Sequence, residues 1–402
     1  MDTKCLAVPD EFIEMIPFNK PYLHGRELVY IAQSVASGKI SGDGVFSKKC
    51  HGYFEQRFGF KKALLTTSCT DALEMAAILL DIRPGDEVIL PSFTFVSTAN
   101  AFALRGATLV FADSCANHPN IDPDHVAALV TDRTKAIVVV HYAGVACDMD
   151  RIMAIAVKHQ ISVIEDAAQA IDSYHKETPL GRIGCLSAFS FHETKNIISG
   201  EGGLLAINDS RFIQRAEIIR EKGTNRSAFF RGETDKYSWV DIGSSFLPPD
   251  TVAAYLYAQL EQMEAIQTRR LQVWKSYESM LRPLAEAGHI KLPTLPTWAT
   301  NNAHMFYILC QNLEVRTRLI ECLKQSGVHA VFHYLSLHKS PYFAGKYSGR
   351  DLIHCDRYAD TLVRLPMYFE ITDDQICCIT AKVFEFFIGK PPVPDQLKAS
   401  NR

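Results

Sequence analysis

Short apolar runs alternate with amphipathic segments from Ala63 to Ala206, and no other feature of the chain restricts its fold as strongly. The runs have the length of strands, and they read EVIL, ATLVFAD, AIVVVHYAG and ISVIEDAA. Helical patterns such as DALEMAAILLDI and MDRIMAIAVKHQ separate them. Strands that are apolar on both faces are typical of a largely parallel sheet that helices cover on both sides. The alternation therefore predicts an α/β fold for this part of the chain.

The pattern changes in the second half of the chain. A long helix that mixes polar and apolar residues is predicted from Leu256 to Leu281, and the later segments HMFYILC and VHAVFHY have the composition of strands. We therefore expect a large domain at residues 1–255 and a smaller α+β domain at residues 256–390. The remaining tail, residues 391–402, is polar and rich in proline, so we expect it to be disordered.

Charge and hydrophobicity argue against two classes of partner. The 42 basic and 45 acidic residues give a net charge of −3, which offers no electrostatic footprint for nucleic acid or an anionic membrane. No apolar run approaches the roughly 20 residues that a membrane-spanning helix needs, and the opening MDTKCLAVPDEFIEMIPF lacks the pattern of a signal peptide. The 11 cysteines are scattered without a CxxC pair, as is typical of reduced thiols. We therefore expect a cytoplasmic protein.

A helix start with small hydroxylic residues follows the first predicted strand. Ser68, Cys69 and Thr70 lie in TTSCTDAL, where the pattern DALEMAAILLDI begins. Free backbone N–H groups and the helix dipole make such a start favourable for an anion. An ordinary Ser or Thr N-cap explains the same residues, so this motif alone leaves both interpretations open.

An acidic residue ends a later apolar strand. Asp166 in VIEDAAQA is followed by small residues, which let a flat molecule approach the backbone. A carboxylate buried at a strand end needs a cationic partner, because its removal from water is otherwise costly. A helix cap or a structural ion pair is the alternative role for Asp166.

A lysine stands between a third strand and a glycine cluster, in SFHETKNIISGEGG. Lys195 follows the apolar run LSAFSF, and open α/β sheets bind ligands beyond the carboxyl ends of their strands. A lysine, a carboxylate and an anion-binding helix start are together what pyridoxal phosphate requires. The amine bonds to the cofactor, the Asp166 carboxylate keeps its ring nitrogen protonated, and the helix start binds its phosphate. There is no P-loop pattern, and the glycines follow a lysine, which disfavours a nucleoside triphosphate or Rossmann site.

Most of the chain, from Ile16 to Phe369, resembles the sugar-nucleotide aminotransferases of the DegT/StrS type, which are pyridoxal-phosphate enzymes of fold type I. The segments that carry the resemblance are PGDEVILPSFTFVSTANAF, VVVHYAGVACDMD, EDAAQ, FSFHETKN, REKGTNRSAFFRG and DIGSSF. The resemblance implies a mostly parallel sheet of seven strands in the large domain. It also implies transamination, because a related dehydratase branch has histidine where this chain has Lys195.

The resemblance assigns roles to the residues of these motifs. It implies that Lys195 bonds to the cofactor, that Asp166 pairs with the ring nitrogen and that Gln169 lies beside the ring. Phe95 would stack on the ring. The phosphate would be held by Ser190 and by the turn of Ser68, Cys69 and Thr70.

The family also builds each active site from two chains, so the resemblance implies a homodimer. Relatives place an asparagine of the neighbouring subunit on the phosphate, where this chain has Ser245 in GSSF. That contact falls to Ser245, to Asn225 in GTNRS, or to neither residue.

Within the family, the segments most resemble the branch that forms dTDP-4-amino-4,6-dideoxy-D-galactose. The implied substrates are dTDP-4-keto-6-deoxy-D-glucose and L-glutamate. Candidate contacts to the diphosphate, the nucleobase and the sugar are Arg231, Phe306, Tyr334 and His338. Further cationic or aromatic candidates nearby are Lys222, Arg226, Phe229 and Phe230. Core packing is the alternative role for each aromatic residue.

Three other functions stay open at this point. An aminotransferase for a 3-keto sugar, or for another 4-keto nucleotide sugar, would carry the same motifs, and a silent member of the fold could act as a regulator. We expect no metal site, because no pair of histidines has the helical spacing of zinc ligands within an acidic cluster. The histidines considered, which we expect to be structural or to contact the substrate, are His141, His192, His333 and His338.

Overall fold

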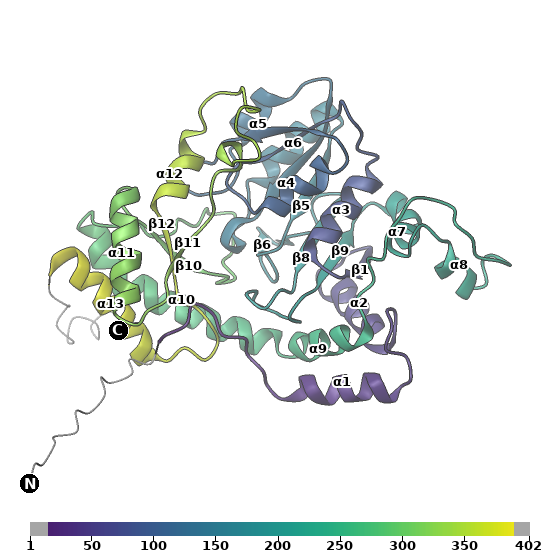
Figure 1. Cartoon of the computed structure of the whole chain (residues 1–402), viewed down its shortest axis with the longest axis horizontal. Coiled ribbons are helices and arrows are strands. Elements are labelled where there is room, and N and C mark those ends of the chain that lie inside the picture. Colours follow the sequence, from purple (N-terminus) through teal and green to yellow (C-terminus); the bar gives the residue numbers. More distant parts are fainter. Residues whose placement is uncertain (1–14, 390–402) are drawn as a thin grey trace, which may run out of the picture.

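A seven-stranded sheet forms the centre of the larger part of the molecule (Figure 1). The computed structural model describes residues 15–389. The spatial order of the strands is β1 (Lys62–Thr66), β9 (Gly203–Ile207), β8 (Leu186–Ser190), β5 (Ser162–Asp166), β4 (Thr134–Val140), β2 (Glu87–Pro91) and β3 (Thr108–Ala112). Only β9 runs antiparallel to its neighbours. The predicted α/β fold with a mostly parallel seven-stranded sheet is therefore confirmed.

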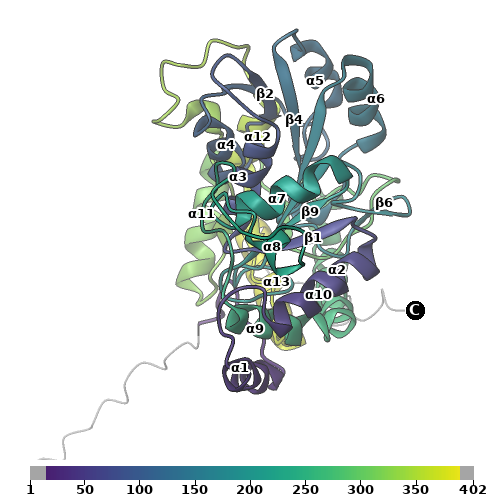
Figure 2. The ribbon, with the colours of Figure 1, turned by 90° about the vertical axis from the view of Figure 1, so that its right-hand side faces the viewer.

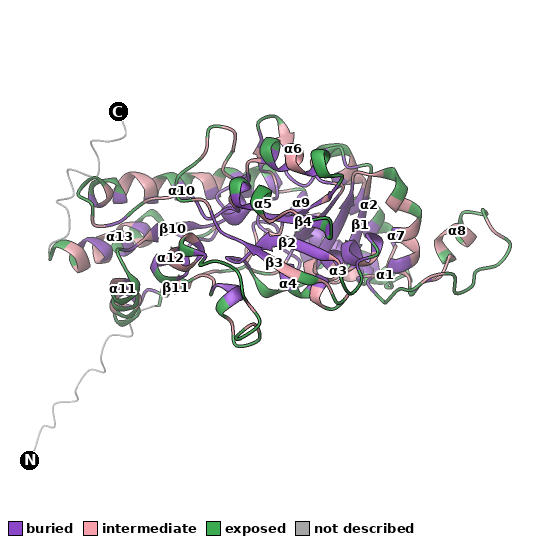
Figure 3. Cartoon of the chain, turned by 90° about the horizontal axis from the view of Figure 1, so that it is seen from above, coloured by how far each residue is buried: buried purple, intermediate pink, exposed green. Residues whose placement is uncertain are grey.

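Helices cover both faces of this sheet, because successive strand residues enter different cores. In β4, Val138 packs in one apolar cluster and Ile137 in another on the opposite face. One face is covered by α3 (Cys69–Leu79), α4 (Val96–Ala103) and α7 (Ile213–Arg220). The other is covered by α2 (Val45–Phe58), α5 (Pro123–Leu129), α6 (Met149–His159) and α9 (Asp250–Leu260). Figure 3 shows the buried strands between α6 on one side and α3 and α4 on the other.

A second, antiparallel sheet lies in the C-terminal part. Its order is β10 (Phe306–Leu309), β12 (Leu362–Leu365) and β11 (Val331–Phe332). The predicted strand segments contain β10 and β11, whereas β12 was not predicted. The smaller sheet shares an apolar core with α10 (Met263–Glu286), α11 (Leu313–Gln325) and α13 (Asp373–Ile388). Helix α12 (Ile353–Thr361) directly precedes β12 in the chain.

The long helix expected at Leu256–Leu281 is wrong in one respect, because the structure divides it into α9 and α10. The turn between them, at residues 261–262, contains no glycine or proline, so the sequence carries no signal for it. The expected domain boundary after residue 255 falls inside α9. This helix packs against α1 (Arg26–Ala36) and α2, and Figure 2 shows α1 and α9 side by side below the sheet. The structure thus groups α9 with the larger sheet.

A projecting arm extends from the larger sheet. It consists of α8 (Arg226–Phe230) and the loop that follows, and Figures 1 and 3 show it standing away from the other elements. A two-stranded ribbon of β6 (Tyr174–His175) and β7 (Thr178–Pro179) lies elsewhere on the surface. Within residues 15–389, no helix has the length and hydrophobicity to cross a membrane. The tail that was expected to be disordered lies outside the described residues.

Candidate active site

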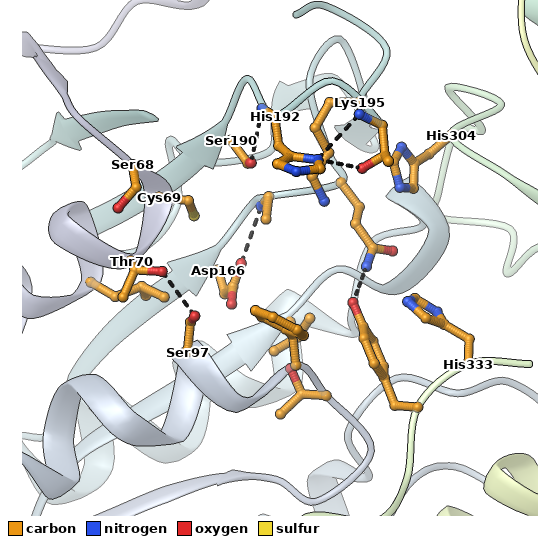
Figure 4. Close-up of a pocket in the computed structure, with 18 of the residues that line it drawn as sticks. Ser68, Cys69, Thr70, Ser97, Asp166, Ser190, His192, Lys195, His304 and His333 are labelled. Atoms are coloured by element: carbon orange, nitrogen blue, oxygen red, sulfur yellow. Dashed lines mark hydrogen bonds between the residues drawn. The ribbon is translucent and has the colours of Figure 1, made fainter. Parts of the chain in front are cut away.

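A cavity of about 640 Å³ lies beyond the carboxyl ends of β4, β5 and β8, against residues of the C-terminal part. Among the residues that line it are nine that the sequence analysis singled out: Ser68, Cys69, Thr70, Phe95, Asp166, Gln169, Ser190, Lys195 and Tyr334. Figure 4 shows Ser68, Cys69 and Thr70 on one side of this cavity, Lys195 on another, and Asp166 between them. Three separate motifs of the sequence therefore meet in one place.

Lys195 lies in a tight turn after β8, where its backbone N–H donates to the His192 carbonyl at 2.9 Å. Its side chain lines the cavity and makes no hydrogen bond or ion pair with any other described residue. Burial lowers the pKa of the Lys195 amine, although the nearby Cys69 and Asp166 act in the opposite direction. A lowered pKa favours the neutral amine, which is the form that acts as a nucleophile or as a base.

Asp166 is the last residue of β5, and its carboxylate is buried. The carboxylate accepts hydrogen bonds from the Thr98 hydroxyl at 2.7 Å and from the Ala168 backbone N–H at 3.1 Å. Within residues 15–389, no basic side chain lies within 4.0 Å of it. Burial raises the pKa of Asp166, and the two hydrogen bonds oppose this rise only partly. The carboxylate is thus fixed in orientation but has no cation in the described chain, which argues against a structural ion pair.

The N-terminus of α3 approaches the cavity. The Ser68 hydroxyl caps the helix by accepting a hydrogen bond from the Asp71 backbone N–H at 3.0 Å, so the N-cap interpretation applies. The N–H groups of Cys69 and Thr70 still have no acceptor among the described residues. They lie close to the start of β9, where a Cβ added to Gly203 would be 2.3 Å from the Ser68 carbonyl carbon. Free N–H groups at a helix start suit a phosphate.

An aromatic and amide wall lines the space next to Asp166. The Gln169 side chain accepts a hydrogen bond from the Ala143 backbone N–H at 2.6 Å and donates one to the Tyr334 hydroxyl at 3.0 Å. The Phe95 side chain is 56% exposed at the cavity, and its ring centre is 6.1 Å from that of Tyr334. A flat aromatic ligand could therefore stack on Phe95 beside a fixed amide.

Phe306 was expected at the substrate and is placed elsewhere, so this prediction is wrong. Its side chain is fully buried in the C-terminal core, where its ring stacks on Tyr277 at 5.2 Å and meets Trp274 edge-on at 5.3 Å. The reason is its position in β10, where its side chain packs with α10 and not toward the cavity. Core packing, the alternative role, applies here.

Four further candidates lie outside the cavity of Lys195. His338 is buried between the Ser92 hydroxyl at 2.7 Å and the Asp356 carboxylate at 3.7 Å. Arg231 and Ser245 line a second cavity of about 760 Å³. Asn225 lines neither cavity, and its side chain accepts a hydrogen bond from the Ser238 backbone N–H at 2.8 Å.

Sequence reasoning missed Thr98, which donates to Asp166, and the cavity-lining residues His304 and Arg364; His333, which it did consider, also lines the cavity. His304 shares a hydrogen bond with the Asn196 side chain at 2.9 Å, and burial lowers the pKa of this histidine well below its usual value. His333 shares one with the Tyr142 hydroxyl at 2.9 Å. His304, His333 and Arg364 come from the C-terminal part, so their proximity to Lys195 depends on how the two sheets pack. For Arg364 the sequence did offer one signal of a binding role, because an arginine interrupts the apolar run LVRLPM.

The donors and acceptors of this cavity match the groups of pyridoxal phosphate. A buried carboxylate without a cation suits a protonated ring nitrogen, an amine with a lowered pKa suits the covalent bond, and the start of α3 suits the phosphate. Phe95 offers its face to the ring. Among the described residues there is no group of three or more His, Cys, Asp or Glu side chains that could hold a metal ion.

Comparison with known proteins points to the same chemistry. Residues 21–384 match the model of the DegT/DnrJ/EryC1/StrS aminotransferase family. The spore coat polysaccharide biosynthesis protein SpsC of Bacillus subtilis (strain 168) is 31% identical over 375 residues, which cover 90% of this chain and 94% of SpsC. The crystal structure of the aminotransferase TlmJ from Streptoalloteichus hindustanus is similar, with a TM-score of 0.85, 27% identity and coverage of 92% of this chain and 98% of TlmJ.

A further similar structure is that of an aminotransferase from Psychrobacter cryohalolentis, with a TM-score of 0.86, 26% identity and coverage of 93% of this chain and 100% of the other. The likeness therefore extends over nearly the whole length of each protein. Together with the match to the family model, it shows that the chain belongs to the DegT/DnrJ/EryC1/StrS aminotransferase family and is a pyridoxal-phosphate-dependent sugar aminotransferase.

Proposed function

We propose that the enzyme transfers the amino group of L-glutamate to dTDP-4-keto-6-deoxy-D-glucose and so forms dTDP-4-amino-4,6-dideoxy-D-galactose. The observation that carries the transamination is the meeting of Lys195 and Asp166 in one cavity, each without an ion pair. The choice of sugar is supported by the resemblance of REKGTNRSAFFRG to the galactose-forming branch. The segment HMFYI adds less support, since Phe306 lies in the core.

The bound cofactor supplies an electron sink for the electron pair left on the carbon that carries the amino group. The residues of the chain hold it and move the proton. Asp166, oriented by Thr98, would keep the ring nitrogen of the cofactor protonated, and the N–H groups of Cys69 and Thr70 would bind its phosphate together with the Ser190 hydroxyl. With the cofactor bound, the free amine of Lys195 would take the proton from the amino-acid carbon and give it to the cofactor carbon that receives the amino group. Burial lowers the pKa of this amine, which shifts its equilibrium toward the basic form.

Product analysis tests the proposed substrate. Purified enzyme with cofactor, glutamate and dTDP-4-keto-6-deoxy-D-glucose should give the galacto-configured 4-amine, identified by NMR. Preferential amination of a 3-keto isomer would replace the proposed sugar with the first alternative. A purified protein that is yellow but keeps its colour in excess glutamate would favour the silent regulator.

We also propose a homodimer in which the projecting arm, α8 and the loop that follows it, contacts the partner. Large apolar side chains on the arm are exposed, and Trp239, Phe230 and Tyr237 have exposed fractions of 79%, 70% and 54%. Patches of this kind mark interaction sites. In the dimer, Ser245 or Asn225 would reach the phosphate of the neighbouring site. A monomer that is fully active at the assay concentration in sedimentation velocity would contradict this proposal.

The cysteines support a cytoplasmic location. All ten that the structure describes are free, which fits a reducing compartment.

A further inference from the structure

Arg364 is a buried cation close to the reacting amine. It lies in β12, the central strand of the smaller sheet, opposite Tyr307 of β10 and Val331 of β11. Its side chain lines the cavity that contains Lys195. Its charge also helps to lower the pKa of Lys195, after the larger effect of burial. Arg364 therefore acts electrostatically on the group that carries out the chemistry.

No other described residue neutralises this arginine. Its guanidinium makes no hydrogen bond or ion pair in residues 15–389, and its Nε is buried without an acceptor. The one contact of note is with the ring of Phe18, whose centre lies 4.6 Å from Cζ. Burial lowers the pKa of Arg364, but a guanidinium keeps its proton at neutral pH. An unpaired buried charge is costly, so the position is favourable when an anion completes it.

Arg270 shows that a buried arginine in this region can find partners. Its guanidinium donates to the Ala303 carbonyl at 3.0 Å and to the His304 carbonyl at 2.6 Å. Arg364 lies near the same segment, since its charge also lowers the pKa of His304. The lack of acceptors is thus specific to Arg364, on the side that lines the cavity.

The acids of the cavity do not supply the missing anion. Asp166 is fixed by Thr98 and Ala168 and is matched to the ring nitrogen of the cofactor. The Glu201 side chain is 73% exposed at the rim, 3.7 Å from His192. The phosphate of the cofactor is accounted for by the start of α3. The anion must therefore come from a substrate.

The chemistry of the two substrates selects one of them. In an amino acid the α-carboxylate is bonded to the carbon that carries the reacting amine, so it must lie beside Lys195. In the nucleotide sugar the diphosphate is bonded to C1, across the ring from the keto carbon at C4. Building on the proposed function, we propose that Arg364 binds the α-carboxylate of the amino donor and that it contributes far less to the sugar half-reaction.

The two half-reactions can be measured separately in Arg364→Gln. The first half-reaction starts from enzyme loaded with pyridoxal phosphate and uses glutamate. The second starts from enzyme loaded with pyridoxamine phosphate and uses the keto sugar. The absorbance of the cofactor reports the progress of both. We expect kcat/KM for glutamate to fall about 100-fold, because a charge-assisted bond to a carboxylate is lost. The sugar half-reaction should stay within about threefold of the wild type. Arg364→Lys should restore part of the glutamate reaction, since it keeps the charge without the planar fork.

Two further measurements separate binding from structure. L-alanine has only the α-carboxylate, so its reaction should suffer the same loss in Arg364→Gln as that of glutamate. Glutarate, which has no amino group, should raise the melting temperature of the wild type with increasing concentration and leave that of Arg364→Gln unchanged. The control is Arg318→Gln. The Arg318 side chain is 66% exposed, pairs loosely with Glu314 at 3.9 Å and lies 5.8 Å from the ring centre of Phe386, outside the cavity lining, so this variant should match the wild type throughout.

The outcomes distinguish this inference from the proposed function. If the wild type reacts with glutamate and Arg364→Gln reacts equally well, the inference fails and the function stands. Equal losses of kcat/KM in both half-reactions would show that Arg364 has a structural role. A loss with glutamate but none with alanine would contradict the assignment to the α-carboxylate. A wild type that is loaded with cofactor yet reacts with no amino acid would overturn both.

Discussion

Two cavities of the described chain differ in how their buried and partly buried charges are paired. In the cavity of Lys195, the amine, the Asp166 carboxylate and the Arg364 guanidinium have no ion pair with any described residue. In the second cavity, Arg220 pairs with Asp43 at 2.6 Å, and Arg231 pairs with Glu217 at 2.9 Å and Glu233 at 2.7 Å. Charges that the chain leaves without partners are costly unless a ligand completes them. The first cavity is therefore built for bound molecules. In the second, the arginines are paired by the chain itself, whereas Lys39, Lys48 and Lys222 line it without an ion pair to a described residue.

The pKa shifts follow the same division. In the first cavity burial moves the pKa of Lys195 down and that of Asp166 up, so each shift favours the neutral form. In the second cavity the hydrogen bonds of Glu233 and Glu217 raise the pKa of Arg231, which favours the charged form. Burial alone would raise the pKa of Asp43, but the charge of Arg220 lowers it overall. Ion pairs thus dominate in one cavity and burial in the other.

Removing Lys195 should have the largest effect, because it takes the reacting amine from the first cavity. Lys195→Ala is expected to abolish measurable transamination in both half-reactions. The fold should persist, since the side chain has no partner among the described residues. Stopped-flow absorbance measures the activity, and circular dichroism checks the fold. Residual turnover near the wild-type rate would assign the chemistry to another residue.

Replacing the unpaired carboxylate should separate activity from stability. Asp166→Asn is expected to slow transamination about 100-fold or more, since an amide holds the ring nitrogen protonated far less well. The folded-state pKa of Asp166 is raised, so in the cofactor-free protein its ionised form costs stability at any pH above its ordinary value. The cofactor-free variant should therefore melt at the same temperature as the wild type or higher at neutral pH. A large loss of melting temperature would instead give Asp166 a structural role.

Substitutions in the projecting arm, which lies beside the second cavity, should weaken dimerisation. Trp239→Ser is expected to weaken dimerisation by about 30-fold, as is typical when an aromatic contact at the centre of an interface is lost. Phe387→Ser, in α13, would be a poor control because that residue packs against the C-terminal core. Leu104→Ser is better matched, since Leu104 is 65% exposed and lies outside the arm. Sedimentation equilibrium at several concentrations measures both, and equal dissociation of the two variants would remove the arm from the interface.

The smallest effect is expected at Arg231. Its side chain is 43% exposed and already paired with two glutamates, so its charge is available to a diphosphate only in part. Arg231→Ala should raise KM for the nucleotide sugar by about tenfold or less and leave the glutamate half-reaction nearly unchanged. Steady-state and single-turnover kinetics check this. Equal damage to the two half-reactions would indicate that Arg231 has a structural role.

The local motifs of the larger sheet could be predicted because each one sits at the end of a strand. Asp166, Ser190 and the turn at Ser68 follow apolar runs, and parallel strands bring their carboxyl ends to one edge of a sheet. That regularity is enough to place residues from three distant segments around one cavity. It requires no knowledge of how the smaller sheet packs.

The C-terminal contribution could not be predicted in the same way. Phe306 and Arg364 are both in short strands of the second sheet, yet one enters the core and the other lines the cavity. The packing between the two sheets decides which face of a short strand meets the larger sheet. The hydrophobic periodicity of the sequence carries no information about that packing. The break between α9 and α10 was missed for a related reason, since α9 packs against α1 and α2 and no breaker in the sequence marks its end.

The unpaired amine of Lys195 is expected to hold the cofactor beside Asp166. Borohydride reduction of the holoenzyme, followed by proteolysis and mass spectrometry, tests it most directly because reduction makes the bond to the lysine permanent. The expected result is a single pyridoxyl-modified peptide that contains Lys195, with no such peptide from Lys195→Ala treated in parallel. A pyridoxyl group on any other lysine of the wild type, such as Lys222 at the second cavity, would contradict the account.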